Sequence, residues 1–242
     1  DEVEQDIIVP LAQNFLTNDY SIPDMLKVLM KSQHFYDEDT IATTSDNNIG
    51  ALIKSPIDVH TTLLRLFNVT TPDRGTDTSN FYTDFEYLVS KLVDQGLNFY
   101  EPFEVAGYPA YHQIPGYNRN WIMTYALAHR YQTGDILMKR GGTGNETSIQ
   151  LDVLDWAENS GEVDPKSSTD IVTVLTKNLL AVELNTERFN YFLDTVFLDT
   201  LSQATWLSEW NNYIGGGDDL VVRERLETLV SSLIQTPEFQ LI

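Results

Sequence analysis

Apolar side chains recur at helical spacing along most of the chain, and this periodicity restricts its fold more than any other feature. Near the start, Ile7, Leu11 and Phe15 fall on one face of a predicted helix, and the segment 22–29 repeats the pattern. No segment shows sustained two-residue alternation, although 149–156 (IQLDVLDW) is compatible with a short strand. We therefore predict an all-α fold of packed amphipathic helices with long irregular loops and no substantial sheet.

Capping residues mark where two of the early helices begin. Ser21 and Asp24 have the spacing of a capping box, in which two side chains satisfy the free N–H groups of a first helical turn. At the start of a later helix, Ser55 suits the N-cap, Pro56 the first helical position and Asp58 the third. These residues predict helix starts after Ser21 and after Ser55.

Further helices are predicted in the second half of the chain. Gly134 is interpreted as the C-cap of a helix that begins near Trp121, and the stripe of this helix through Ile122, Tyr125 and His129 is expected to face the core. Beyond it, the apolar spacing predicts helices over about 168–183, 187–213 and 219–236, with a break in the second of them near Ser202.

The distribution of glycine and polar residues suggests how the chain is divided. Residues 1–140 form an N-terminal helical part that contains an irregular aromatic loop at 96–118. Residues 141–150 include GGTGNETS and read as a linker-like loop, and residues 151–242 form a C-terminal helical part. We expect the two helical parts to pack as one unit.

Composition excludes several classes of protein. The net charge is −21, from 36 acidic and 15 basic residues, so the surface repels nucleic acid and anionic membranes, and we expect no nucleic-acid partner. No apolar run approaches the 18 or so residues of a membrane span, so we expect no membrane insertion. The absence of cysteine excludes disulfides, thiolate metal sites and a cysteine nucleophile.

Sequence motifs for catalysis are missing. There is no HExxH, Walker, GxSxG or GxGxxG motif, and we expect neither a metal site nor a cofactor. The four histidines are widely separated: His34, His60, His112 and His129. Glu101 and Glu104 flank the aromatic loop, but loop carboxylates are usually solvated, and a glycosidase pair requires a defined separation across a cleft.

The stretch EPFEVAGYPAYHQIPGYNRNW, at 101–121, is the most unusual segment. Its aromatic residues are Phe103, Tyr108, Tyr111, Tyr117 and Trp121. With His112 and Arg119 nearby, the rings could bind a sugar, which needs apolar faces and hydrogen-bonding groups together. Alternatively, the segment is a plug that buries its rings against the helices. We expect Phe103 and Trp121 to be mostly buried, and at least one of the three tyrosines to be exposed beside Arg119 or His112.

Four stretches, in order along the chain, resemble the C-terminal half of the bacterial domain of unknown function 1800 family. They are IKSP with the following LLR, NFYEPFEVAGY at 98–108, NWI with Leu127 and Arg130, and the closing TPEFQL at 236–241. The chain departs from the family pattern at Phe103 and Tyr108, where the family commonly has Pro and Trp.

The resemblance implies a setting but no activity. Members resemble larger, often exported proteins with an additional N-terminal helical half, and they are often encoded near a sulfatase-like protein. It follows that this chain is expected to be extracytoplasmic (periplasm, cell surface or secreted), to lack an N-terminal half, and to have a sulfatase-like protein as a partner. A missing half predicts exposed apolar side chains, above all on the helix at 2–18.

Three cations among the family's shared positions have no local explanation. Lys54, Arg65 and Arg130 either pair with buried carboxylates or bind an anionic ligand.

Taken together, these sequence features favour a non-catalytic envelope or surface module that binds glycan or a protein partner. The alternative is a hydrolase acting on polysaccharide or on a sulfated or phosphorylated substrate. A deep pocket with converging carboxylates or histidines would favour the hydrolase, and a shallow aromatic strip or an apolar patch would favour the binding module.

Overall fold

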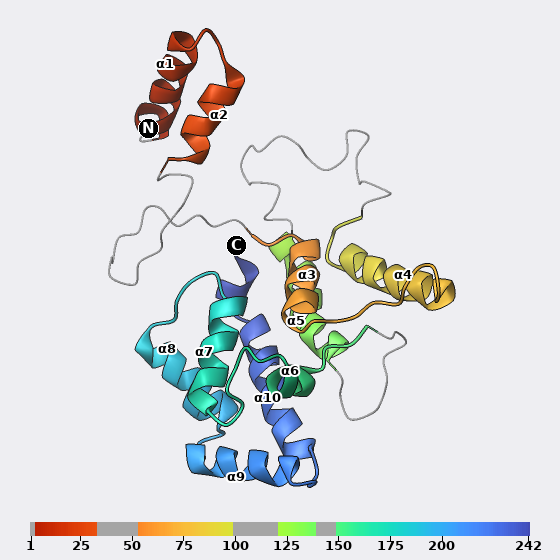
Figure 1. Cartoon of the computed structure of the whole chain (residues 1–242). Coiled ribbons are helices and arrows are strands. Elements are labelled where there is room, and N and C mark those ends of the chain that lie inside the picture. The colour runs from red at the N-terminus through yellow and green to blue at the C-terminus, as the bar shows by residue number, and fades with distance from the viewer. Residues whose placement is uncertain (1–2, 33–52, 99–120, 139–148) are drawn as a thin grey trace. The chain divides into compact units, whose positions relative to one another are not determined.

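The computed structural model describes residues 3–32, 53–98, 121–138 and 149–242 (Figure 1). Over these ranges every named element is a helix, which confirms the predicted all-α class. Extended pairing in the described part of the chain is limited to two isolated bridges, an antiparallel one between Ile53 and Leu241 and a parallel one between Met138 and Leu151. None of the described helices is both long and apolar enough to cross a bilayer.

The chain forms two compact units, 1–50 and 51–242. The first contains a π-helix, η1 (Val3–Ile8), followed by α1 (Val9–Thr17) and α2 (Ile22–Met30). This boundary falls inside the predicted 1–140 part, and the domain limits given by the sequence stay a prediction.

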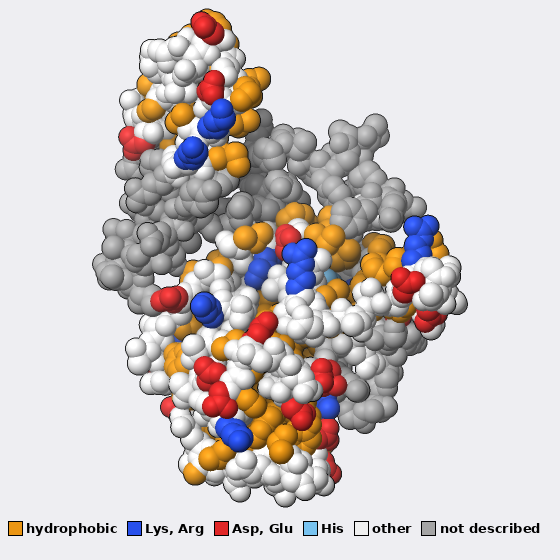
Figure 2. Space-filling model, in the orientation of Figure 1, with side chains coloured by type: hydrophobic (Ala, Val, Ile, Leu, Met, Phe, Trp, Pro, Cys, Tyr) orange, Lys and Arg blue, Asp and Glu red, His pale blue; other side chains and the backbone are white. Residues whose placement is uncertain are grey.

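The helices of the first unit have no fully buried residue. Many of their apolar side chains are exposed, as the orange surface in Figure 2 shows: Ile8, Val9, Leu16, Tyr20, Ile22, Leu26, Val28 and Met30. The expectation that the first helix exposes apolar side chains is therefore confirmed, whereas its attribution to a missing half stays a prediction.

The second unit is arranged around its last long helix. Its elements are α3 (Pro56–Leu66), α4 (Thr78–Asp94), α5 (Thr124–Leu137), α6 (Val153–Asn159), α7 (Ser168–Leu179), α8 (Thr186–Asn190), the π-helix η3 (Tyr191–Phe197), α9 (Gln203–Ile214), α10 (Leu220–Ile234) and the 3₁₀ turn η4 (Glu238–Gln240). Helix α10 contacts α5, α6, α7, α9 and η3.

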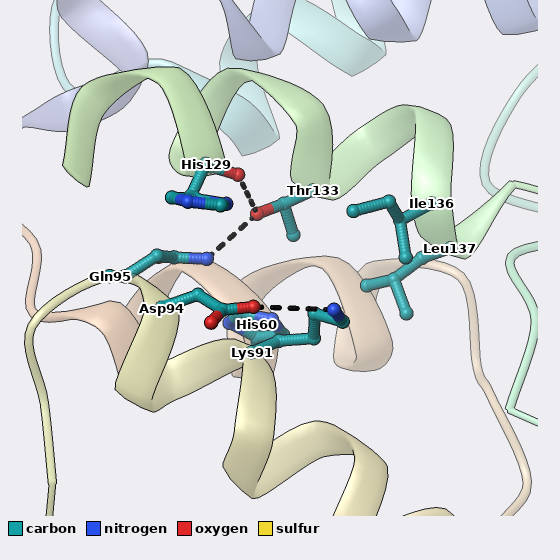
Figure 3. Close-up of a pocket in the computed structure, with 8 residues that line it drawn as sticks. All are labelled: His60, Lys91, Asp94, Gln95, His129, Thr133, Ile136 and Leu137. Atoms are coloured by element: carbon teal, nitrogen blue, oxygen red, sulfur yellow. Dashed lines mark hydrogen bonds and ion pairs between the residues drawn. The ribbon is translucent and has the colours of Figure 1, made fainter. Parts of the chain in front are cut away.

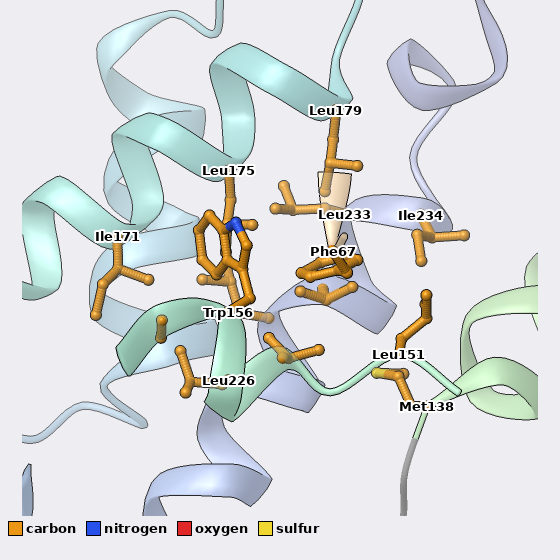
Figure 4. Packing of buried hydrophobic residues seen from close by; sticks show 14 of the residues in the cluster. Phe67, Met138, Leu151, Trp156, Ile171, Leu175, Leu179, Leu226, Leu233 and Ile234 are labelled. Atoms are coloured by element: carbon orange, nitrogen blue, oxygen red, sulfur yellow. The ribbon is translucent and has the colours of Figure 1, made fainter. Parts of the chain in front are cut away.

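The apolar core of this unit lies against α10 (Figure 4). Leu226 and Leu233 of α10 are fully buried, and Leu175 of α7 packs into the same cluster. The rings of Phe67 and Trp156 meet edge to face at 5.6 Å, a favoured aromatic arrangement. Each large side chain buried here contributes roughly 1.5–3 kcal/mol relative to exposure, so this cluster is the main source of stability.

Local capping signals predicted several boundaries correctly. Ser55 and Asp58 form a reciprocal capping box at the start of α3, with Pro56 in the first turn. Ser202 accepts from the Thr205 N–H and begins α9, which confirms the predicted break. At α2 the geometry differs, because the Ser21 hydroxyl donates to Asp24 Oδ2 at 2.7 Å and makes no cap bond to the backbone.

Two predictions for α5 are wrong. Gly134 lies inside the helix instead of ending it, and its lack of a side chain serves the packing on α10, because a Cβ atom there would lie 2.7 Å from Ile234 Cδ1. The predicted inward stripe through Ile122 and Tyr125 is exposed. The helix turns a different face inward, formed by Ala126, Arg130, Thr133, Gly134 and Leu137, and Gly134 on this face allows the close approach to α10.

Candidate functional site

The candidate glycan-binding residues lie outside the described part of the chain. These are Tyr108, Tyr111, His112, Tyr117 and Arg119, and Phe103 lies there with them. Trp121, just beyond that range, is partly buried. The choice between a sugar-binding run and a buried plug therefore stays a prediction.

Lys54 and Arg130, singled out from sequence alone, meet in the interior of the second unit. The Lys54 ammonium donates to the carbonyls of Phe239 at 2.8 Å and Leu179 at 3.2 Å, and it lies 4.3 Å from the centre of the Phe239 ring. Burial, followed by repulsion from Arg130, lowers the pKa of Lys54 to about 8. The low pKa shows that the site tolerates this positive charge poorly.

Arg130 of α5 is fully buried and binds two other segments. Its Nε donates to Gln240 Oε1 at 2.7 Å, and its Nη2 donates to the Lys54 carbonyl at 2.9 Å. Gln240 in turn donates to the Ile234 carbonyl at 2.8 Å. Burial lowers the pKa of Arg130 to about 10.

These two cations form a polar junction that joins the start of α3, α5 and the C-terminal turn. The sequence offered two roles, pairing with buried carboxylates or binding an anionic ligand. Among the described residues, the partners of Lys54 and Arg130 are main-chain carbonyls and one amide. Arg65 is separate from this junction: it is exposed in the last turn of α3 and makes no ion pair with any described residue.

A small pit opens between α3, α4 and α5 (Figure 3). Its lining comprises His60, Lys91, Asp94, Gln95, His129, Thr133, Ile136 and Leu137. Gln95 Nε2 donates to the Thr133 hydroxyl at 2.9 Å, and Lys91 pairs with Asp94 at 3.3 Å. Gln95 Oε1 is buried with no partner among the described residues.

The pit brings together His60 and His129, which are distant in the sequence, but its chemistry is limited. His60 Nδ1 lies 2.9 Å from the Pro56 carbonyl, and burial lowers the pKa of His60, so the neutral ring donates to that carbonyl. The pit volume is about 10 Å³, which suits one water-sized group and no larger substrate. Nowhere in the described ranges do three or more His, Asp or Glu side chains form a group that could hold a metal ion.

A larger, open groove lies beside the C-terminal half of α7, and we call it the α7–α8 groove. It has a volume of about 390 Å³ and is lined by Thr173, Thr176, Lys177, Leu180, Ala181, Val182, Glu183, Leu184 and Phe189. The connection 180–185 forms one wall, and its Ala181 N–H donates to the Glu238 carbonyl at 3.3 Å. This contact and the Arg188–Glu238 ion pair at 3.1 Å attach the wall and α8 to the C-terminal turn.

Sequence reasoning identified neither Gln240 nor the groove. Gln240 belongs to the closing TPEFQL stretch, and a glutamine between apolar neighbours was the available signal that its amide is buried. The connection 180–185 was predicted to be partly helical, and its sequence, LAVELN, has no Gly or Pro to mark the end of α7.

Comparison with known proteins places the chain in a family without adding an activity. No curated protein and no solved structure matches it. A family model described as "Protein of unknown function (DUF1800)" matches residues 1–241. The resemblance seen in the sequence is confirmed, and the chain belongs to the DUF1800 family.

Proposed function

We propose that this protein is a non-catalytic binding module that works outside the cytoplasm and holds a protein partner or a glycan in the α7–α8 groove. The observation that carries the proposal is the groove itself. Its volume of about 390 Å³ lies in the range of ligand-binding sites, roughly 300–1,000 Å³, and its lining combines apolar side chains with a few polar ones. An open groove of this kind suits a ligand that is part of a larger molecule.

The alternative, a hydrolase, finds less support in the described residues. Glycoside hydrolysis needs two carboxyl groups across a cleft, and Glu183 is the one carboxylate among the described residues that line the groove. The pit has two histidines and Asp94, but its volume of about 10 Å³ leaves no room for a substrate. A binding role uses what the groove offers and requires no further catalytic group.

The net charge of the chain further restricts the class of ligand. A chain with a net charge of −21 repels sulfated and phosphorylated polymers and attracts basic ones, whereas it leaves the binding of neutral ones unaffected. The extracytoplasmic setting and a sulfatase-like partner belong to the proposal through the family resemblance. The tyrosines at 108, 111 and 117 remain a second candidate surface for glycan.

The proposal can be tested by blocking the groove in the whole chain. Ala181 is exposed and lines the groove, so Ala181→Arg fills the site without disturbing the core. Val221→Arg is the matched control, because Val221 is exposed on α10 and does not line the groove. Both variants and the unchanged chain are screened against a neutral-glycan array and a phage-displayed random 12-residue peptide library, with melting temperatures as a check on folding.

We expect the unchanged chain and Val221→Arg to select the same ligands, and Ala181→Arg to lose them. The proposal is wrong if the unchanged chain selects nothing from either set, or if Ala181→Arg selects as well as the control does. Release of reducing sugar from an arrayed glycan would instead favour the hydrolase.

A further inference from the structure

We propose that the occupant of the α7–α8 groove is a peptide segment in which an aliphatic side chain lies next to a lysine or arginine. This inference rests on the proposed function and specifies its ligand. It follows from the floor of the groove, its free backbone groups and its charges.

The floor favours an aliphatic side chain over a sugar ring. Leu180, Val182 and Leu184 supply branched aliphatic surface, and Leu180 also packs into the core. Sugars bind by stacking a flat C–H face on an aromatic ring, and Phe189 is the one ring among the described lining residues. Phe189 and Leu184 are both partly buried against the core, so the number of aliphatic side chains against this single ring is what favours an aliphatic ligand. Branched aliphatic surface is instead complementary to Leu, Ile or Val.

The backbone of the groove wall is available for hydrogen bonding. Among the described residues, no acceptor is found for the N–H groups of Val182, Glu183 and Leu184. The neighbouring Ala181 N–H is already used, because it donates to the Glu238 carbonyl. Consecutive N–H groups of an extended segment point to opposite sides, so those on the groove side are the ones that can donate to the carbonyls of a bound peptide.

The opposite wall offers acceptors. The Thr173 hydroxyl donates to the Thr169 carbonyl at 2.7 Å, and the Thr176 hydroxyl donates to the Val172 carbonyl at 2.8 Å. Each hydroxyl proton is therefore committed to α7, and only the oxygen lone pairs remain for a ligand. The α7 wall therefore offers acceptors in these two hydroxyl oxygens beside the donor Lys177, and a peptide backbone, with its alternating C=O and N–H groups, can use both kinds of group.

The charge of the groove indicates which residue of the peptide should lie next to its aliphatic side chain. Glu183 is exposed on the groove wall, and no described cation pairs with it, whereas the nearby Arg188 is already paired with Glu238 at 3.1 Å. The net charge of −21 draws basic partners towards the molecule, and Glu183 provides a contact for one at the groove. Lys177, on the α7 wall, suits a peptide carbonyl or a C-terminal carboxylate.

The test is a charge reversal at Glu183 with a matched control on the adjacent helix. Glu183→Lys changes the groove, and Glu187→Lys makes the same change on α8, where Glu187 is exposed and does not line the groove. A phage-displayed random 12-residue peptide library is selected against both variants and the unchanged chain. The affinity of the most enriched sequence is then measured with a synthetic fluorescent peptide.

We expect the unchanged chain and Glu187→Lys to enrich an aliphatic residue adjacent to Lys or Arg. Glu183→Lys should lower the affinity for the enriched peptide by about fivefold, the order expected for losing and reversing one exposed charge contact. Glu187→Lys should lower this affinity by less than about twofold. Replacing the aliphatic residue of the peptide with Ser should abolish binding.

The failure of this inference is distinguishable from failure of the proposed function. Glycan binding that Ala181→Arg abolishes, with no peptide enriched, overturns the peptide inference and leaves the binding module in place. Enriched peptides without a basic residue, or equal weakening by Glu183→Lys and Glu187→Lys, also overturn it. Selection of nothing from either ligand set overturns both.

Discussion

Two kinds of interaction hold the interior of the second unit together: apolar packing around α10, and the polar junction at Lys54 and Arg130. Around α10, fully buried residues such as Leu226 and Leu233 interact through close apolar contact. At the junction, two buried cations bind carbonyls and the Gln240 amide. An apolar contact tolerates a swap of similar volume, whereas a buried cation bound to specific acceptors does not.

The difference indicates what each region contributes. Apolar packing supplies most of the stabilising free energy because it removes the largest area from water. The junction fixes geometry, because each of its hydrogen bonds joins segments far apart in the chain, 76 residues for Arg130 to Lys54 and 185 for Lys54 to Phe239. It thereby holds the C-terminal turn, to which one wall of the groove is attached.

The largest expected effect is at Arg130. Arg130→Ala leaves Gln240 Oε1 and the Lys54 carbonyl without their donor and opens a cavity in a fully buried site. We expect a loss of about 3–5 kcal/mol in the free energy of unfolding, measured by urea denaturation. Arg130→Lys should recover less than half of this loss, because a single ammonium cannot reproduce the forked geometry. A loss below about 1 kcal/mol for Arg130→Ala would show that the junction is not needed for stability.

The second prediction uses pH to isolate the buried charge of Lys54. Its pKa is about 8 in the folded protein and 10.5 in an unfolded chain, so between these values the unfolded chain binds more protons. Stability contributed by this group should therefore rise as pH increases through 8, by about 1.5 kcal/mol between pH 8 and 9.5, because the slope approaches 1.36 kcal/mol per unit only above the folded pKa. Well below pH 8 the group adds no pH dependence, because it is protonated in both states.

Lys54→Met provides the comparison for this pH profile, because it removes the titrating group and keeps the apolar stem. Its unfolding free energy, measured at each pH in urea, should lack the rise that the unchanged chain shows between pH 8 and 9.5. Identical slopes in the two proteins would mean that Lys54 titrates at its ordinary pKa and that the junction tolerates the charge.

The helix starts could be predicted from the sequence because the capping bonds that define them join residues only three positions apart. Ser55 and Asp58 cap α3 through bonds that span three residues, so their roles can be recognised from the residues themselves. Ser202 is a similar case at α9. Lys54 and Arg130 could be selected as unexplained cations, but their partners are 76 to 185 residues away, and nothing in the local sequence identifies them.

The incorrect predictions have the same cause, because they concern contacts between segments that are distant in the sequence. A glycine late in an apolar-periodic segment usually ends a helix, but Gly134 instead permits the approach of a residue 100 positions later. The groove arises where the connection 180–185 passes α7, and only the packing of the C-terminal turn sets that geometry.

The third prediction tests the contact between α5 and α10 directly. Gly134→Ala gains helix propensity, about 1 kcal/mol, but its Cβ would lie 2.7 Å from Ile234 Cδ1 inside a fully buried site. We expect a net loss of about 1–2 kcal/mol in unfolding free energy. Ile234→Val removes the clashing methyl group, so the double variant should be more stable than the sum of the two single changes predicts. Additive effects in this cycle would show that the two helices separate to admit the methyl group at little cost.

The smallest effect is expected at Arg65, and it completes the comparison between cations. Arg65 is a cation that the family resemblance singles out together with Lys54 and Arg130, but it is exposed in the last turn of α3 and is unpaired among the described residues. Its stabilising role is limited to a favourable interaction with the C-terminal end of the helix dipole, so Arg65→Ala should change the unfolding free energy by about 0.5 kcal/mol or less. If stability alone accounted for all three shared cations, Arg65→Ala would destabilise the protein as strongly as Arg130→Ala does. A near-neutral result in urea denaturation therefore separates Arg65 from the junction, and it marks the exposed guanidinium as the one of the three that no described residue pairs with and that a partner could contact.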